Sequence, residues 1–107
     1  MKLIITIVSK DDASAVMKEL VNHRFFVTKL ASTGGFLRSG NTTLMIGTND
    51  DQVDKAVSII TENSKNRKEL VPGSIVNEFG MFSSQPIEVN IGGATMFIVD
   101  VEKIVKV

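Results

Sequence analysis

Hydrophobic and polar residues follow two alternating kinds of pattern along this chain. The continuous apolar run over residues 3–8 is typical of a buried strand. The apolar residues that follow recur at the i, i+3, i+4 and i+7 spacing of one helical face; they are Ala13, Val16, Met17, Leu20 and Val21. Ser9 and Asp12 stand three residues apart before this face and predict the helix N-terminus. A strand and then a helix are therefore expected at the start of the chain.

The same order of patterns returns further along. We expect strands at 25–32 and 43–48, with a capping signal at Asn49 and Gln52. A second helical face follows; it consists of Val53, Ala56, Val57 and Ile60. Strands are expected again at 87–91 and 94–101, separated by two glycines. The chain thus contains two similar halves, each of them strand, helix and strand.

A doubled βαβ unit predicts the ferredoxin-like α+β fold, an antiparallel sheet with two helices on one face. Each half has two aspartates where its helix begins, Asp11-Asp12 and Asp50-Asp51. Carboxylates at this position favour the helix dipole, and we prefer that role to a catalytic pair because adjacent side chains do not converge on one atom.

The strands are apolar on both faces, which one layer of helices does not explain. Leu3, Ile5 and Ile7 alternate with Ile4 and Val8 in the first strand. The simplest cover for the second face is another subunit, and the alternative is a loop folded back over it. The candidate loop, 64–86, has no clean period yet holds several apolar residues. We otherwise expect a single domain over 1–107.

Composition excludes several functional classes. Lys+Arg and Asp+Glu both number 12, so the zero net charge argues against nucleic-acid binding. Cysteine is absent, and the single histidine, His23, is expected to serve the first helix's C-terminus rather than a metal. No apolar stretch approaches the length of a membrane span, so we expect a cytoplasmic protein without membrane insertion. No catalytic residue, metal ligand or cofactor is predicted.

The segment 28–43 is dense in small and hydroxylated residues and is the best candidate for a binding site. Its glycines, Gly34, Gly35 and Gly40, allow close backbone approach, although a plain connection between strands also uses glycine. Phe36 suits stacking on a base or a plug into the core. Asn41 suits a base edge or an Asx-turn. Arg38 suits a phosphate or a solvated loop.

The sequence from Thr28 to Thr43, TKLASTGGFLRSGNTT, with MKLII at the start of the chain, resembles the cyclic di-AMP receptors of the PII-like superfamily. The Gly92-Gly93-Ala94-Thr95 strand is similar to theirs as well. The chain departs from the family pattern at Phe26, where a basic residue is usual, and in the 64–86 loop. The resemblance implies a PII-like homotrimer that binds cyclic di-AMP in clefts between subunits, without catalysis. It further implies loop rearrangement on binding and a protein partner downstream.

The resemblance also implies the site residues. Ligand contacts are expected from Thr28, Gly35, Phe36, Leu37, Asn41, Gly47 and Phe97, with Arg38 as a possible phosphate contact. Three other functions stay open at this point. One is a PII-type sensor of ATP or ADP with the same fold, and another is an acylphosphatase-like hydrolase that would use Arg38 and Asn41. The third is a pure protein-interaction module, in which Phe36 would close the pocket.

Overall fold

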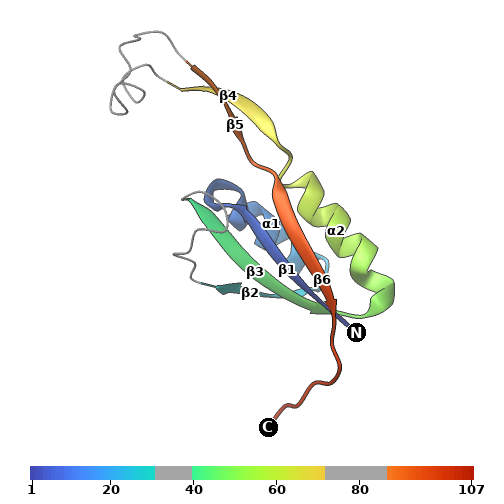
Figure 1. The fold of residues 1–107 in the computed structure, drawn as a ribbon. Helices are drawn as coiled ribbons and strands as arrows, with labels where there is room; N and C mark the ends of the chain where they lie inside the picture. The colour runs from blue at the N-terminus through green and yellow to red at the C-terminus, as the bar shows by residue number, and fades with distance from the viewer. Residues whose placement is uncertain (31–39, 72–86) are drawn as a thin grey trace.

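A four-stranded antiparallel sheet and two helices form the body of the protein (Figure 1). The computed structural model describes residues 1–30, 40–71 and 87–107. In chain order the body consists of β1 (Lys2–Ser9), α1 (Lys10–Asn22), β2 (Phe26–Leu30), β3 (Asn41–Thr48), α2 (Val53–Glu62) and β6 (Ala94–Asp100). The strand order is β2-β3-β1-β6, with every neighbouring pair antiparallel. This arrangement is compatible with the predicted ferredoxin-like fold.

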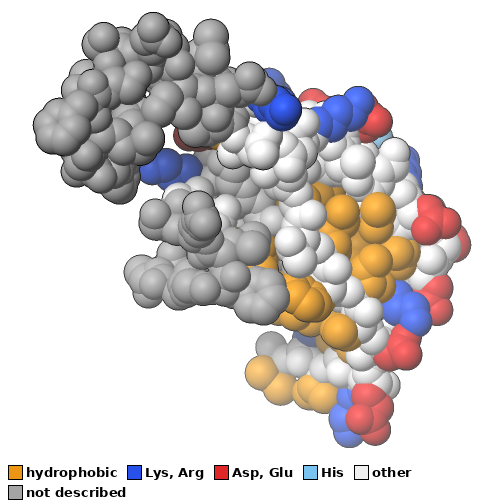
Figure 2. All heavy atoms as spheres, turned by 45° about the horizontal axis from the view of Figure 1, so that its top comes forward, with side chains coloured by type: hydrophobic (Ala, Val, Ile, Leu, Met, Phe, Trp, Pro, Cys, Tyr) orange, Lys and Arg blue, Asp and Glu red, His pale blue; other side chains and the backbone are white. Residues whose placement is uncertain are grey.

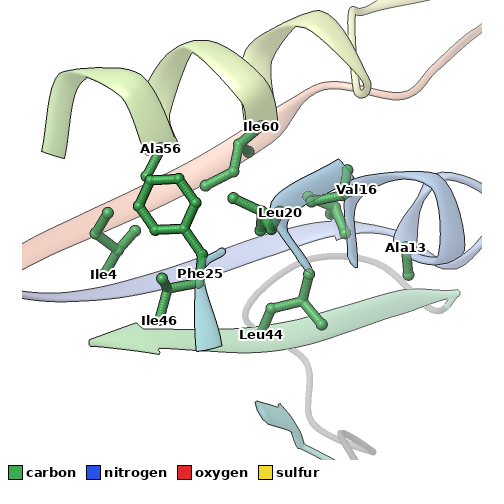
Figure 3. Packing of buried hydrophobic residues seen from close by; sticks show 10 residues of the cluster. Ile4, Ala13, Val16, Leu20, Phe25, Leu44, Ile46, Ala56 and Ile60 are labelled. Atoms are coloured by element: carbon green, nitrogen blue, oxygen red, sulfur yellow. The ribbon is translucent and has the colours of Figure 1, made fainter. Parts of the chain in front are cut away.

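The core lies between the helices and one face of the sheet. Ile4 and Val8 of β1, with Leu44 and Ile46 of β3, project from this face because side chains alternate along a strand. Val16 and Leu20 of α1 and Ala56 and Ile60 of α2 pack against them, as Figure 3 shows. All eight side chains are almost fully buried, so both predicted helical faces are confirmed at their centres.

The ends of the predicted elements differ in detail from the structure. Val21 was expected in the buried face of α1 but is 57% exposed. At about 100° per residue it lies roughly 80° around the helix from Ala13, at the edge of the stripe that contacts the sheet. β3 begins at Asn41 rather than 43, so Asn41 is a strand residue and not part of a turn.

Polar groups end α1 at both of the predicted positions, but the predicted cap of the second helix does not form. Ser9 is the N-cap of α1, and its hydroxyl accepts a hydrogen bond from the Asp11 N–H at 3.3 Å. His23 is the C-cap, with Nδ1 2.8 Å from the Glu19 carbonyl. A 3-10 turn, η1 (Asp50–Gln52), precedes α2, and Asn49 stands before it without the expected side-chain cap bond.

A two-stranded ribbon projects from the body, and it corrects the prediction of an unbroken 64–86 loop (Figure 1). β4 (Arg67–Val71) lies inside that range and pairs antiparallel with β5 (Ile87–Ile91). Residues 67–71 are a strand because their backbone pairs with β5. The RKELV sequence has no strict alternation of apolar and polar residues that would have predicted a strand. The rest of the expected loop, 72–86, lies outside the described residues.

The base of the ribbon is fixed to the start of α1. The guanidinium of Arg67 donates two hydrogen bonds to the Asp12 carboxylate, at 3.0 and 3.2 Å. Gly92 lies beside this pair with a positive φ of 81°, and a Cβ there would stand 2.5 Å from the Lys65 carbonyl oxygen. Asp12 is in the first turn of α1, as predicted, but its carboxylate serves this ion pair as well as the helix dipole.

Candidate functional site

The four predicted site residues that the structure describes share one face of the sheet, the face without helices. Thr28 pairs with Met45, Met45 with Ile5, and Ile5 with Phe97. Two of the predicted residues, Thr28 and Phe97, therefore stand at the two ends of one row of side chains that crosses β2, β3, β1 and β6. Gly47 and Asn41 lie on the same face because they are two and four residues from Met45 along β3.

This face is apolar, and no helix of the described part of the chain covers it. Leu3, Ile5 and Ile7 are half-buried, whereas Phe97 and Val99 are 42% and 44% exposed. Figure 2 shows hydrophobic side chains reaching the molecular surface as a connected area beside charged side chains of both signs. An area of this kind on a small protein usually marks a surface that binds something. The prediction of apolar residues on both faces is thus confirmed.

Thr28 and Gly47 border one open groove of about 410 Å³ on this face. Leu3, Phe26 and Met45 supply its apolar surface. The groove offers a hydroxyl from Thr28 and exposed backbone at Gly47, where an added Cβ would have no heavy atom within 4 Å. A flat apolar group with a hydrogen-bonding edge fits such a lining.

The segment after β6 also reaches this groove, although none of its residues was among the predicted ligand contacts. Val101 donates its N–H to the Met1 carbonyl at 3.2 Å, which directs the following residues past the end of the sheet. Ile104 and Lys106 then line the groove, and Ile104 is 56% exposed. The signal available in the sequence was a pair of apolar residues, Ile104 and Val105, between Lys103 and Lys106.

Asn41 and Phe97 lie apart from this groove. Asn41 is six residues from Gly47 along β3, which corresponds to about 20 Å. It borders a separate hollow of about 260 Å³ with Ile7, Asn66 and the Gly92–Thr95 segment. Phe97 is in the outer strand β6 and Thr28 in the outer strand β2, about 14 Å apart over three strand spacings. One copy of the chain does not gather all four residues around one point.

A basic hollow of about 430 Å³ adjoins the groove at the end of the sheet. Met1, Phe26 and Gly47 border both spaces. The Met1 amino group is 2.8 Å from the Asp50 carboxylate, and this hydrogen bond lowers the pKa of Asp50. Asp50 is therefore ionised and held by a partner at neutral pH.

The remaining predicted contacts, Gly35, Phe36, Leu37 and Arg38, lie outside the described residues. Within the described ranges there is no cluster of three or more His, Cys, Asp or Glu side chains placed to hold a metal. None of the helices described is long and apolar enough to cross a membrane.

Comparison with known proteins gives the family. A family model described as "Cyclic-di-AMP receptor" matches residues 1–107. A crystal structure of a functionally unknown protein from Pediococcus pentosaceus ATCC 25745 is 35% identical, with a TM-score of 0.77. The match covers 99% of this chain and 96% of that one, so the similarity extends over the whole fold. On the match over its full length, together with the Thr28–Thr43 sequence motif, this chain belongs to the family of cyclic di-AMP receptors.

Proposed function

We propose that the protein is a non-enzymatic receptor that binds cyclic di-AMP between copies of the chain in a homotrimer. The observation that carries this proposal is the placement of Thr28 and Phe97. They lie in the two outer strands of the sheet, on the same uncovered apolar face. A cleft formed by the β2 side of one copy and the β6 side of the next would bring such residues together.

In this proposal each residue type has a physical role. Phe97, Phe36 and Leu37 give flat apolar contact to an adenine, and Thr28 and Asn41 give hydrogen bonds to polar edges. Gly35 and Gly47 leave room for close approach, and Arg38 pairs with a phosphate. Ligand binding rearranges the adjacent loops and thereby signals to a protein partner.

Calorimetric titration with cyclic di-AMP tests the function. Separate titrations with ATP and with cyclic di-GMP test whether the protein selects cyclic di-AMP. We expect saturable binding near one ligand per chain, and weaker or no binding of the other two nucleotides. Binding of ATP without cyclic di-AMP would contradict the proposal and favour an ATP or ADP sensor. Turnover of an acyl phosphate would favour a hydrolase.

Thr28→Val tests the groove within the same titration. It removes a hydroxyl but keeps a β-branched residue in an exposed strand position. Loss of one hydrogen bond should weaken cyclic di-AMP binding by about 0.5–1.5 kcal/mol. Thr61→Val is the matched control, because Thr61 is an exposed residue of α2 whose hydroxyl donates a hydrogen bond to the Val57 carbonyl of its own helix. Equal affinity of the two variants would remove Thr28 from the site.

A further inference from the structure

The β4–β5 ribbon leaves the body through two short crossings that are bonded to each other. The first crossing is residues 63–66, between α2 and β4, and the second is residues 92–93, between β5 and β6. The Gly93 N–H donates a hydrogen bond to the carbonyl of Ser64, a residue that is 2% exposed. The two crossings are therefore held together, and a tilt of the ribbon turns about this point.

The ion pair between Arg67 and Asp12 lies just beyond this point and connects the ribbon to α1. Arg67 is the first residue of β4, and its guanidinium makes two hydrogen bonds to a carboxylate that is 10% exposed. A Cβ on Gly92 would stand 2.7 Å from Arg67 Nη1 and 3.3 Å from Asp12 Oδ2, so the pair packs against the second crossing. Three segments meet at this pair: α1, β4 and the link between β5 and β6.

The first turn of α1 is also bonded to the start of β3, where a predicted site residue lies. Lys10 donates its N–H to the Gly40 carbonyl at 2.7 Å, and Gly40 directly precedes Asn41. Asn41 borders the hollow of about 260 Å³, and so do Gly92 and Asn66, which adjoin the ion pair in space and in sequence. One turn of helix thus connects the β3 side of this hollow to its ribbon side.

We infer that the Asp12–Arg67 pair is a latch that positions the ribbon and sets the shape of the Asn41 hollow, so that ligand binding at Asn41 is coupled to the orientation of the ribbon. This inference rests on the proposed function for the identity of the ligand, cyclic di-AMP. Asp12 and Arg67 are positioning residues, since neither lines the hollow. Without the latch, binding must also order the ribbon, which costs affinity. Every step from Asn41 to the ribbon is a peptide link, a hydrogen bond or an ion pair.

Arg67→Gln and Asp12→Asn break the latch from its two sides. Each variant should weaken cyclic di-AMP binding about threefold to tenfold, the cost of ordering a loosened segment. The double variant should bind no more weakly than either single variant, because the same latch is lost in all three. Lys65→Gln is the matched control, since it removes a nearby positive charge from an ion pair whose side chains are both 64% exposed. Its affinity should stay within about twofold of the wild-type value.

Hydrogen exchange with and without cyclic di-AMP separates coupling from a purely structural role. In the wild-type protein, the ligand should alter amide exchange in β4 and β5 as well as at Asn41. In Arg67→Gln at saturating ligand, the change at Asn41 should remain and the change in the ribbon should disappear. A ribbon that responds equally in the two proteins, or that does not respond in the wild-type protein, would overturn the inference.

Failure of the latch and failure of the proposed function give different results. If the wild-type protein binds cyclic di-AMP and both latch variants bind it as Lys65→Gln does, the latch is wrong and the receptor function stands. If the wild-type protein does not bind cyclic di-AMP, the proposed function is wrong, and NMR of the free protein decides the latch. Shifts of the Asn41 amide signals in both latch variants but not in Lys65→Gln would support it, and unchanged Asn41 signals would overturn it.

Discussion

Gly47 and Gly92 both lack a side chain, but their surroundings predict opposite consequences for alanine. At Gly92 the φ of 81° is strained for any L-residue, and the new Cβ would meet the Lys65 carbonyl oxygen at 2.5 Å and Arg67 Nη1 at 2.7 Å. We expect Gly92→Ala to lower the free energy of unfolding by about 1–3 kcal/mol. Denaturant unfolding measures this loss, and hydrogen exchange should show it around the start of β6.

Gly47→Ala, in β3, is the control for Gly92→Ala because it makes the same substitution at an uncrowded position. No heavy atom lies within 4 Å of the built Cβ, so the free energy of unfolding should change by no more than about 0.5 kcal/mol. The methyl group would instead enter the groove, and cyclic di-AMP affinity should fall. A stable Gly92→Ala protein, or a Gly47→Ala protein that loses stability without losing affinity, would contradict this comparison.

At the scale of elements, one ion pair connects α1 to the β4–β5 ribbon. Asp12 is 10% exposed and Arg67 is 41% exposed at the side chain, so solvent screens the pair only in part. A double-mutant cycle with Asp12→Asn and Arg67→Gln should give a coupling of about 1 kcal/mol in the free energy of unfolding. The coupling is expected because Arg67 makes two hydrogen bonds to the Asp12 carboxylate, and water has little access to that carboxylate.

The Glu62–Lys65 pair provides the control for this cycle. Its atoms are 3.1 Å apart, but both side chains are 64% exposed, so its coupling should be near zero. A Glu62→Gln and Lys65→Gln cycle measures it under the same conditions. Equal couplings for the two pairs would mean that burial of Asp12 contributes nothing to the attachment of the ribbon.

At the scale of the whole molecule, we predict that the proposed trimer assembles through the apolar face of the sheet that no helix covers. Val99 lies on this face opposite Leu3, while its neighbour Ile98 projects to the helix side, and the two are 44% and 45% exposed. Val99→Asp should dissociate the proposed trimer and weaken cyclic di-AMP binding, because a carboxylate at a buried apolar interface is costly to desolvate. Sedimentation equilibrium reports the mass, and calorimetry reports the affinity.

Ile98→Asp separates this effect from a general effect of a surface charge. It introduces the same carboxylate at the same exposure on the other face, and the trimer should persist. A wild-type protein that sediments as a single chain would contradict the assembly outright. Dissociation by both variants to the same extent would show that the uncovered face has no special role.

The periodic patterns were enough to place the sheet and the helices. Val16 and Leu20 recur at the spacing of one helical face and Ile4 and Val8 at that of one strand face, and all four are buried where expected. Such positions are predictable because the spacing of apolar residues in the sequence matches the repeat of the helix or strand, and the face on which they fall is the face that becomes buried. The Thr28–Thr43 motif likewise identified the family before any contact was known.

Only the tertiary structure decided how distant segments meet. β4 exists because Arg67–Val71 pairs with β5, and the Asp12 carboxylate has a partner 55 residues away. Thr28 and Gly47 border one groove, whereas Asn41 lies about 20 Å along the same strand from Gly47. The sequence determined the elements because helix and strand periodicity are local properties. Pairing partners and pockets depend on which surfaces meet after folding, and no local pattern encodes that.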